Sequence, residues 1–166
     1  DDDVDRLYFV VSRIFRSTLR SPKAAQQVGV TRETAFDYHA SARQLERVAD
    51  HAAKIAQVSL ELDAVDEEVG DAIEALHGDA VDIIETAMDA LFEEDNDAAT
   101  DLANEARQAV LAVDEHARSI DDLLRDLEPQ QAKHLGLVVD SLSRSADYGG
   151  NVAETALQNA APRPAV

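Results

Sequence analysis

The chain has 166 residues, 45% of them hydrophobic, so it is long and apolar enough to bury a core and is not expected to be disordered. Its net charge of −19 repels phosphate backbones and anionic membranes, so direct nucleic-acid contact by this segment is not expected. It has no cysteine for disulfides or thiolate metal sites, no bilayer-spanning apolar run and no leader peptide, which indicates a cytoplasmic protein without membrane insertion.

Apolar residues recur at helical spacing and no alternating pattern is sustained, so the chain is predicted to be all-α. A first helix ends near Ser21 and Pro22, because proline disfavours helical geometry in the residue before it. A loop through Gly29 follows. A long second helix begins after Thr31, a suitable N-cap, and runs to about Leu62.

Three further helices are predicted in the rest of the chain. The third is capped by Asp63, and the fifth begins at Pro129, which a first helical turn accepts. Within the fifth helix, Gly149 and Gly150 are expected to allow a neighbouring backbone to approach closely. Residues 161–166 are expected to form a disordered tail.

Two segments share a Leu-x-Arg-x-Ala-Asp frame: residues 45–56 read LERVADHAAKIA and residues 142–153 read LSRSADYGGNVA. Long helices joined by short turns pack as antiparallel bundles, and the repeat predicts two tandem three-helix-bundle units. Residues 1–62 would be an incomplete first unit and residues 63–160 the second. The first helix of the first unit is expected upstream of this chain, which predicts an exposed apolar groove on that unit.

Glu46 and Asp50 are four residues apart on one helix face, where like charges repel by about 0.2–0.5 kcal/mol unless a cation lies near them. Two interpretations remain open. Arg43 and Arg47 can neutralise the pair, or a hard metal ion can bind the carboxylate oxygens.

Acidic pairs at the same spacing open the helices that precede each copy of the repeat, although acid near a helix N-terminus is also favourable by itself. The second copy keeps Asp147 but has Ser143 where the first has Glu46, so a second metal site is expected to be weaker. The candidate metal ligands are therefore Glu46, Asp50, Asp147, Asp5, Asp1 and Asp101.

Two motifs of helical-bundle proteins with catalytic chemistry also occur. Glu74 and His77 form a Glu-x-x-His, the unit of carboxylate-bridged di-iron bundles, but no second copy exists. His51 and Lys54 form a His-x-x-Lys, as in phosphorelay bundles, where a solvent-facing histidine accepts the phosphoryl group. No Gly-rich phosphate loop, Ser-His-Asp set or zinc signature is present, so an enzyme is not expected. The remaining histidines for which no partner is evident are His39, His116 and His134.

Residues 45–56 resemble the Leu-Glu-Arg-Ile-(Gly/Ala)-Asp-His-Ala-x-x-Ile-Ala segment of the PhoU family, and residues 142–153 resemble the weaker segment of that family's second repeat. The run DVDRLYFVVSRIFR is similar to the family's middle helix, with Asp5 at its Ile-Asp-x-Leu position. The resemblance implies a non-enzymatic, cytoplasmic regulator of phosphate uptake and signalling. Its implied partners are a phosphate-transporter ATPase or a sensor protein, together with further copies of itself.

The resemblance also bears on metal and origin. The family's Glu/Asp-x-x-x-Asp motifs hold iron or zinc, which would carry over to Glu46 and Asp50, with Asp147 as the remaining half of the second motif. Acidic residues occur along the whole chain and Lys at only three positions, which is typical of halophilic proteins and suggests a haloarchaeal member. Archaeal relatives often carry an AbrB-like DNA-binding domain, so the alternative is the effector or dimerisation domain of a transcriptional regulator.

Overall fold

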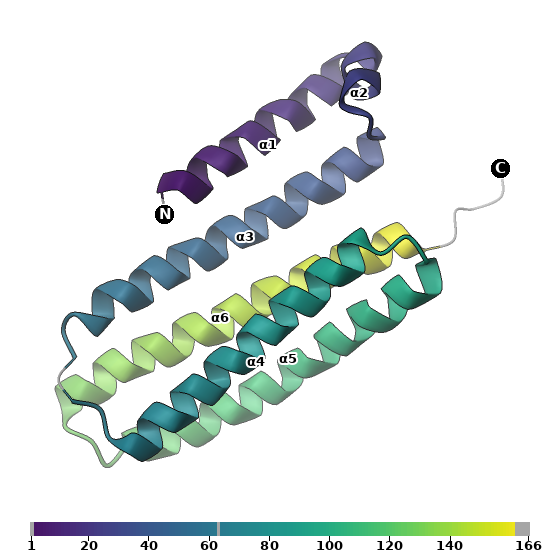
Figure 1. The fold of residues 1–166 in the computed structure, drawn as a ribbon. Coiled ribbons are helices and arrows are strands. Elements are labelled where there is room, and N and C mark those ends of the chain that lie inside the picture. The colour runs from purple at the N-terminus through teal and green to yellow at the C-terminus, as the bar shows by residue number, and fades with distance from the viewer. Residues whose placement is uncertain (1, 63, 162–166) are drawn as a thin grey trace.

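The computed structural model describes residues 2–62 and 64–161, and in these ranges it contains six helices and no strand, which confirms the all-α prediction (Figure 1). None of these helices combines the length and apolarity that crossing a bilayer requires. The helices are α1 (Asp2–Arg20), α2 (Pro22–Val28), α3 (Arg32–Ser59), α4 (Glu67–Phe92), α5 (Asn96–Leu124) and α6 (Pro129–Ala160).

The loop predicted through Gly29 is wrong, because most of it forms the short helix α2. The Ser21 side chain accepts a hydrogen bond from the Ala24 backbone N–H at 3.4 Å, and Pro22 occupies the first helical turn. Gly29 ends the helix with a φ of 81°, a left-handed conformation that costs glycine little. The sequence thus contained three signals of a helix: an N-cap, a proline in the first turn and a terminal glycine. The helix that these signals enclose is only seven residues long.

The caps of the long helices were predicted with mixed success. Thr31 caps α3 as predicted, since its hydroxyl accepts a hydrogen bond from the Thr34 N–H at 3.0 Å. The cap of α4 is Asp66, whose carboxylate accepts from the Glu68 N–H at 3.0 Å. The predicted cap, Asp63, lies outside the described residues. The predicted tail also lies outside them, apart from Ala161.

Helices α4, α5 and α6 pack against one another and enclose the core. Fully buried side chains from each helix meet there, for example Leu76, Ile120 and Ala146. The close approach predicted at Gly149 is present between α6 and α4. A Cβ at this position would lie 2.9 Å from the Ile83 Cγ2 atom and 3.2 Å from the Ile84 backbone nitrogen. Glycine at this position therefore sets how closely the two helices pack.

Helix α3 lies against α6, and the two copies of the repeat meet at this contact (Figure 1). The rings of His51 and Tyr148, which occupy equivalent positions in the two copies, have centroids 5.7 Å apart. On either side of this pair, Gln44 contacts Asn151 at 3.3 Å and Lys54 lies 3.8 Å from Asp140. The helices are therefore antiparallel, and their contacts are nearly symmetric about the pair His51 and Tyr148, as a two-fold relation between the copies requires.

Helix α1 packs mainly on α3, on the side away from α4, α5 and α6 (Figure 1). Its opposite side exposes apolar side chains, including Leu7 at 66% and Val10 at 50% of their surface. The apolar face predicted on this part of the chain is therefore present.

Candidate functional site

The antiparallel register of α1 and α3 determines which side chains meet between them. Phe15 stacks on His39 with ring centroids 4.7 Å apart, which fixes the middle of the contact. From this point toward the start of α1, successive turns of the two helices remain in contact. One turn beyond Tyr8, Asp5 lies beside Glu46. The polar contacts in order are Arg32 Nε to the Thr18 carbonyl (3.2 Å), His39 Nε2 to Ser12 Oγ (3.1 Å) and Arg43 Nη1 to Tyr8 Oη (3.2 Å).

Three candidate ligands, Asp5, Glu46 and Asp50, come together at the end of this contact. Each offers one carboxylate oxygen, and these oxygens all lie within 4.8 Å of one another. Asp5 and Glu46 are partly buried and Asp50 is exposed, so the cluster opens to solvent. Two unit charges at this distance repel by about 1 kcal/mol even in water, and a cation placed among them would relieve this repulsion. No other group of three or more potential ligands is found in the described part of the chain.

The arginines expected to neutralise this pair are engaged elsewhere. Arg43 donates a hydrogen bond to the Tyr8 hydroxyl at 3.2 Å, which lowers the pKa of that hydroxyl. Arg47 lies over the ring of Tyr148 on α6, with its guanidinium carbon 5.5 Å from the centroid. Among the described residues, neither arginine forms an ion pair with Glu46 or Asp50. Arg43 nevertheless lies close enough to Glu46 for the two charges to attract each other, so it offsets part of the negative charge without forming an ion pair.

Tyr8 was not singled out from the sequence. It lies about one turn after Asp5 and holds Arg43 beside the carboxylates without pairing Arg43 to them. The apolar and aromatic stripe of the first helix was visible in the sequence. Predicting this contact, however, requires the register of α1 on α3, which depends on α2 and the turns that flank it.

The other candidate ligands do not join the cluster. Asp147 lies on α6, 3.6 Å from Arg144, and burial raises its pKa although Arg144 opposes this. Asp101 is exposed on α5 and belongs to no cluster among the described residues. Asp1 lies outside the described residues. With Ser143 in place of a glutamate, the second copy of the motif gathers no set of carboxylates like that of the first among the described residues.

The motifs of helical-bundle enzymes also find no supporting geometry. The Nδ1 atom of His51 is buried without a hydrogen-bond partner, its ring packs on Tyr148, and burial lowers its pKa. A phosphorelay histidine would instead face solvent. Glu74 and His77 are both exposed on α4, and no third ligand joins them in the described part of the chain.

The histidines without an evident partner in the sequence all have one in the structure. His116 Nδ1 lies 2.9 Å from the Asp79 carboxylate. His134 is 8% exposed and its Nε2 lies 3.3 Å from Glu61 Oε2. The corresponding partner of His39 is Ser12. These partners lie 27 to 73 residues away in the sequence, so local patterns could not reveal them.

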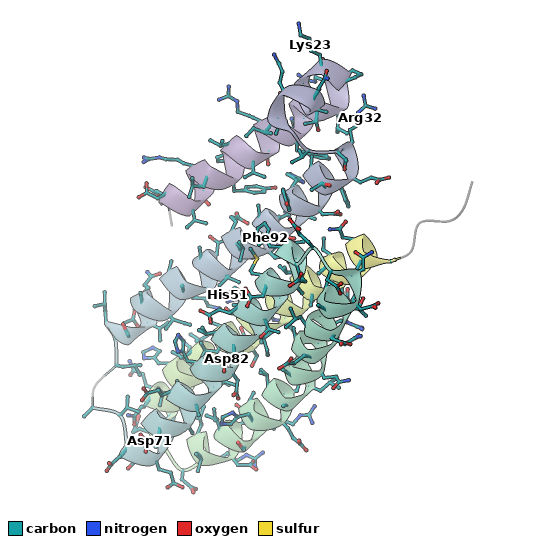
Figure 2. All side chains as sticks on the ribbon, turned by 45° about the vertical axis from the view of Figure 1, so that its right-hand side comes forward. Lys23, Arg32, His51, Asp71, Asp82 and Phe92 are labelled. Carbon is teal, nitrogen blue, oxygen red and sulfur yellow. The ribbon has the colours of Figure 1, made fainter. Side chains whose placement is uncertain are left out.

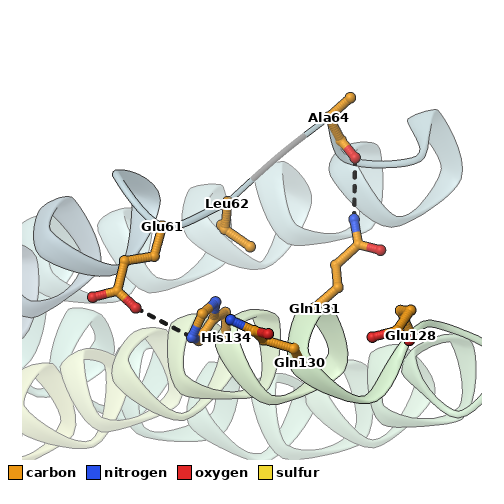
Figure 3. A pocket seen from close by; sticks show the side chains of 7 residues that line it. All are labelled: Glu61, Leu62, Ala64, Glu128, Gln130, Gln131 and His134. Carbon is orange, nitrogen blue, oxygen red and sulfur yellow. Dashed lines mark hydrogen bonds and ion pairs between the residues drawn. The ribbon is translucent and has the colours of Figure 1, made fainter.

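His134 and Glu61 border a pocket of about 330 Å³ at one end of the molecule (Figure 3). Beside them, the Gln131 side-chain amide donates to the Ala64 carbonyl at 3.1 Å. Both contacts join α6 to the chain between α3 and α4. The two contacts therefore hold the α3–α4 connection against the start of α6. The described lining of the pocket contains no cluster of ligands or reactive groups.

Comparison with known proteins identifies one family. The PhoU domain matches residues 1–59, which cover α1, α2 and α3 and therefore all three clustered carboxylates. No curated protein and no solved structure matches the chain. The match supports the resemblance to the PhoU family over residues 1–59 of the 166-residue chain.

Proposed function

We propose that this protein is a PhoU-like regulator of phosphate uptake and phosphate signalling that acts in the cytoplasm through contacts with other proteins. The observation that carries the proposal is the PhoU domain match over residues 1–59. The same segment carries the exposed apolar side chains of α1 and the clustered carboxylates, so its surface has features suited to binding.

The experiment that tests this function combines deletion and capture. A strain lacking the gene should take up phosphate at an altered rate when phosphate is scarce. The tagged protein should also retain the purified ATPase subunit of the phosphate transporter or the cognate sensor protein. Unchanged phosphate uptake together with failure to capture either partner would refute the proposal.

We also propose that Asp5, Glu46 and Asp50 bind one hard divalent or trivalent cation, with iron and zinc as the first ions to test. The support is geometric: three carboxylates from two helices converge, and no described cation forms an ion pair with them. Carboxylate oxygens suit hard cations best, and zinc generally prefers at least one imidazole or thiolate. Ferric iron is therefore expected to bind more tightly than zinc.

Because the ligands come from α1 and α3, the bound ion would join these helices. A cation at about 100 times its dissociation constant would stabilise the fold by about 2.7 kcal/mol, which should raise the melting temperature by about 5–10 °C. Glu46→Gln should abolish this increase. The matched control is Asp97→Asn, which alters an acidic i,i+4 pair that no third ligand joins among the described residues. Equal responses of the two variants would rule out this site.

A further inference from the structure

The helices that form the carboxylate cluster offer few further ligands for a metal ion. The acidic residues Asp71 and Asp82 of α4 lie on the other side of α3 from α1 (Figure 2). Residues 6–32 contain no Asp or Glu, which corrects the expectation that acidic residues occur along the whole chain. Asp5 is therefore the last carboxylate of α1, and a further side-chain oxygen from later in this helix must belong to a hydroxyl group or an amide.

Tyr8 carries the first hydroxyl group after Asp5 in α1. Side chains three residues apart are neighbours on one side of a helix, and aromatic side chains in helices lean toward the N-terminus, which for Tyr8 is toward Asp5. On α3, Arg43 precedes Glu46 by the same spacing, and its Nη1 atom donates to the Tyr8 hydroxyl oxygen at 3.2 Å. The Tyr8 hydroxyl therefore lies between the two helices, within about one helical turn of the carboxylates.

The electrostatics also place Tyr8 near the cluster. The hydrogen bond from Arg43 lowers the pKa of the Tyr8 hydroxyl, and the negative charge of Glu46 opposes this effect. The Glu46 carboxylate thus lies close enough to Tyr8 for the two groups to interact. A hydroxyl oxygen has two lone pairs, so the Tyr8 oxygen can accept the hydrogen bond from Arg43 and still bind a cation.

The charges of the group match a trivalent ion when Tyr8 is ionised. Three carboxylates carry three negative charges, and the nearby Arg43 offsets one of them. A divalent ion balances the remaining two charges while Tyr8 stays neutral. A trivalent ion leaves one positive charge in excess, which a Tyr8 phenolate balances. Phenolate is an anionic oxygen ligand, the type that a hard ion such as ferric iron prefers.

We propose that Tyr8 binds ferric iron as a phenolate, together with the carboxylates of Asp5, Glu46 and Asp50. On binding, the O–H bond of Tyr8 breaks, the proton passes to water, and the oxygen forms a bond to the ion without any transfer of an electron. Arg43 still donates its hydrogen bond to this oxygen and holds the phenolate in position. The inference rests on the metal site proposed above and deepens it, because it assigns a ligand of a different chemical type.

Visible absorption during titration with ferric nitrilotriacetate tests this ligand. Phenolate bound to ferric iron absorbs visible light by charge transfer from the ligand to the metal, and the chain has no cysteine whose thiolate could give a similar band. Tyr8→Phe keeps the ring that stacks on His39 and should abolish the band. The chain has three tyrosines, so Tyr38→Phe and Tyr148→Phe are the matched controls, and both should retain the band.

The affinities for ferric iron and for zinc give a second readout. Zinc leaves Tyr8 neutral, so Tyr8→Phe removes a ligand from the ferric site only. The same variant also frees Arg43, which can then pair with Glu46 and weaken the binding of any ion. The quantity to compare is therefore the ratio of the ferric affinity to the zinc affinity. Competition with nitrilotriacetate should show that Tyr8→Phe lowers this ratio at least about tenfold, whereas Tyr148→Phe leaves it unchanged.

Failure of the Tyr8 assignment can be told apart from failure of the metal site. If ferric iron raises the melting temperature and Glu46→Gln abolishes the increase, the carboxylate site is present. In that case, a missing visible band, or a band that persists in Tyr8→Phe, would show that Tyr8 is not a ligand. If neither ferric iron nor zinc binds in a way that depends on Glu46, the metal site itself is wrong and the role of Tyr8 is refuted with it.

Discussion

Replacing Gly149 by alanine tests whether the close packing of α6 on α4 depends on the absence of a side chain. Two effects of opposite sign follow. Alanine favours a helix over glycine by about 1 kcal/mol. The added Cβ, however, would lie 2.9 Å from Ile83 Cγ2 and 3.2 Å from the Ile84 backbone nitrogen, which cannot move aside without shifting α4. Overpacking of this kind costs about 1–3 kcal/mol. The net change for Gly149→Ala should therefore lie between neutral and about 2 kcal/mol of destabilisation.

Gly78 provides the matched control on α4. A Cβ at Gly78 meets nothing within 4 Å, so Gly78→Ala should gain the helical preference alone, about 1 kcal/mol. Urea unfolding followed by circular dichroism at constant KCl should then separate the two variants by about 1–3 kcal/mol. The melting temperature of Gly78→Ala should rise by about 2–4 °C. If Gly149→Ala is stabilised as much as Gly78→Ala, the two helices do not require glycine at this contact.

Three further outcomes follow from the charges. Burial lowers the pKa of His51, so the unfolded chain takes up a proton first as the pH falls below about 6.5, and stability is lost in that range. His51→Gln should show a smaller loss between pH 7 and 5 in urea titrations, and an identical slope would contradict the assignment. Burial raises the pKa of Asp147, so its ionised form disfavours folding at neutral pH, and the penalty is relieved as the pH falls toward the unfolded value of about 3.8. Asp147→Asn should thus be at least as stable as the unmodified protein at pH 7, with the difference narrowing toward pH 4; a variant that is less stable at pH 7 would argue that the ion pair with Arg144 dominates. The net charge of −19 should make the melting temperature rise between 0.1 and 1 M KCl, as the Debye length falls from about 10 to 3 Å, and a constant or falling value in differential scanning calorimetry would show that self-repulsion is unimportant.

Sequence patterns were most informative where a property depends on neighbours along one helix. The spacing of Glu46 and Asp50 was enough to predict that they share a face, and Gly149 was enough to indicate a close helix contact. The start of α3 at Thr31 followed from cap chemistry alone. These inferences need only the helical period and local hydrogen bonding.

Properties that depend on how helices are placed against one another were less accessible. The contribution of Asp5 to the carboxylate cluster requires the register of α1 on α3, and the direction of Arg47 depends on a tyrosine 101 residues later. Likewise, the pairing of His134 with Glu61 depends on the path between α3 and α4. Side chains as long as arginine reach several partners, so spacing along one helix cannot decide among them.

The position of α3 between α1 and α6 implies that the molecule can open in stages. The main contact of α1 is with α3, so α1 and α2 can separate while the buried core of α4, α5 and α6 stays closed to water. Amide hydrogens of α1 should accordingly exchange through a local opening of low free energy, and those of α4 through global unfolding. A ligand that binds both α1 and α3 would slow amide exchange in α1 selectively. The exchange rate of α1 would then measure the fraction of molecules with ligand bound.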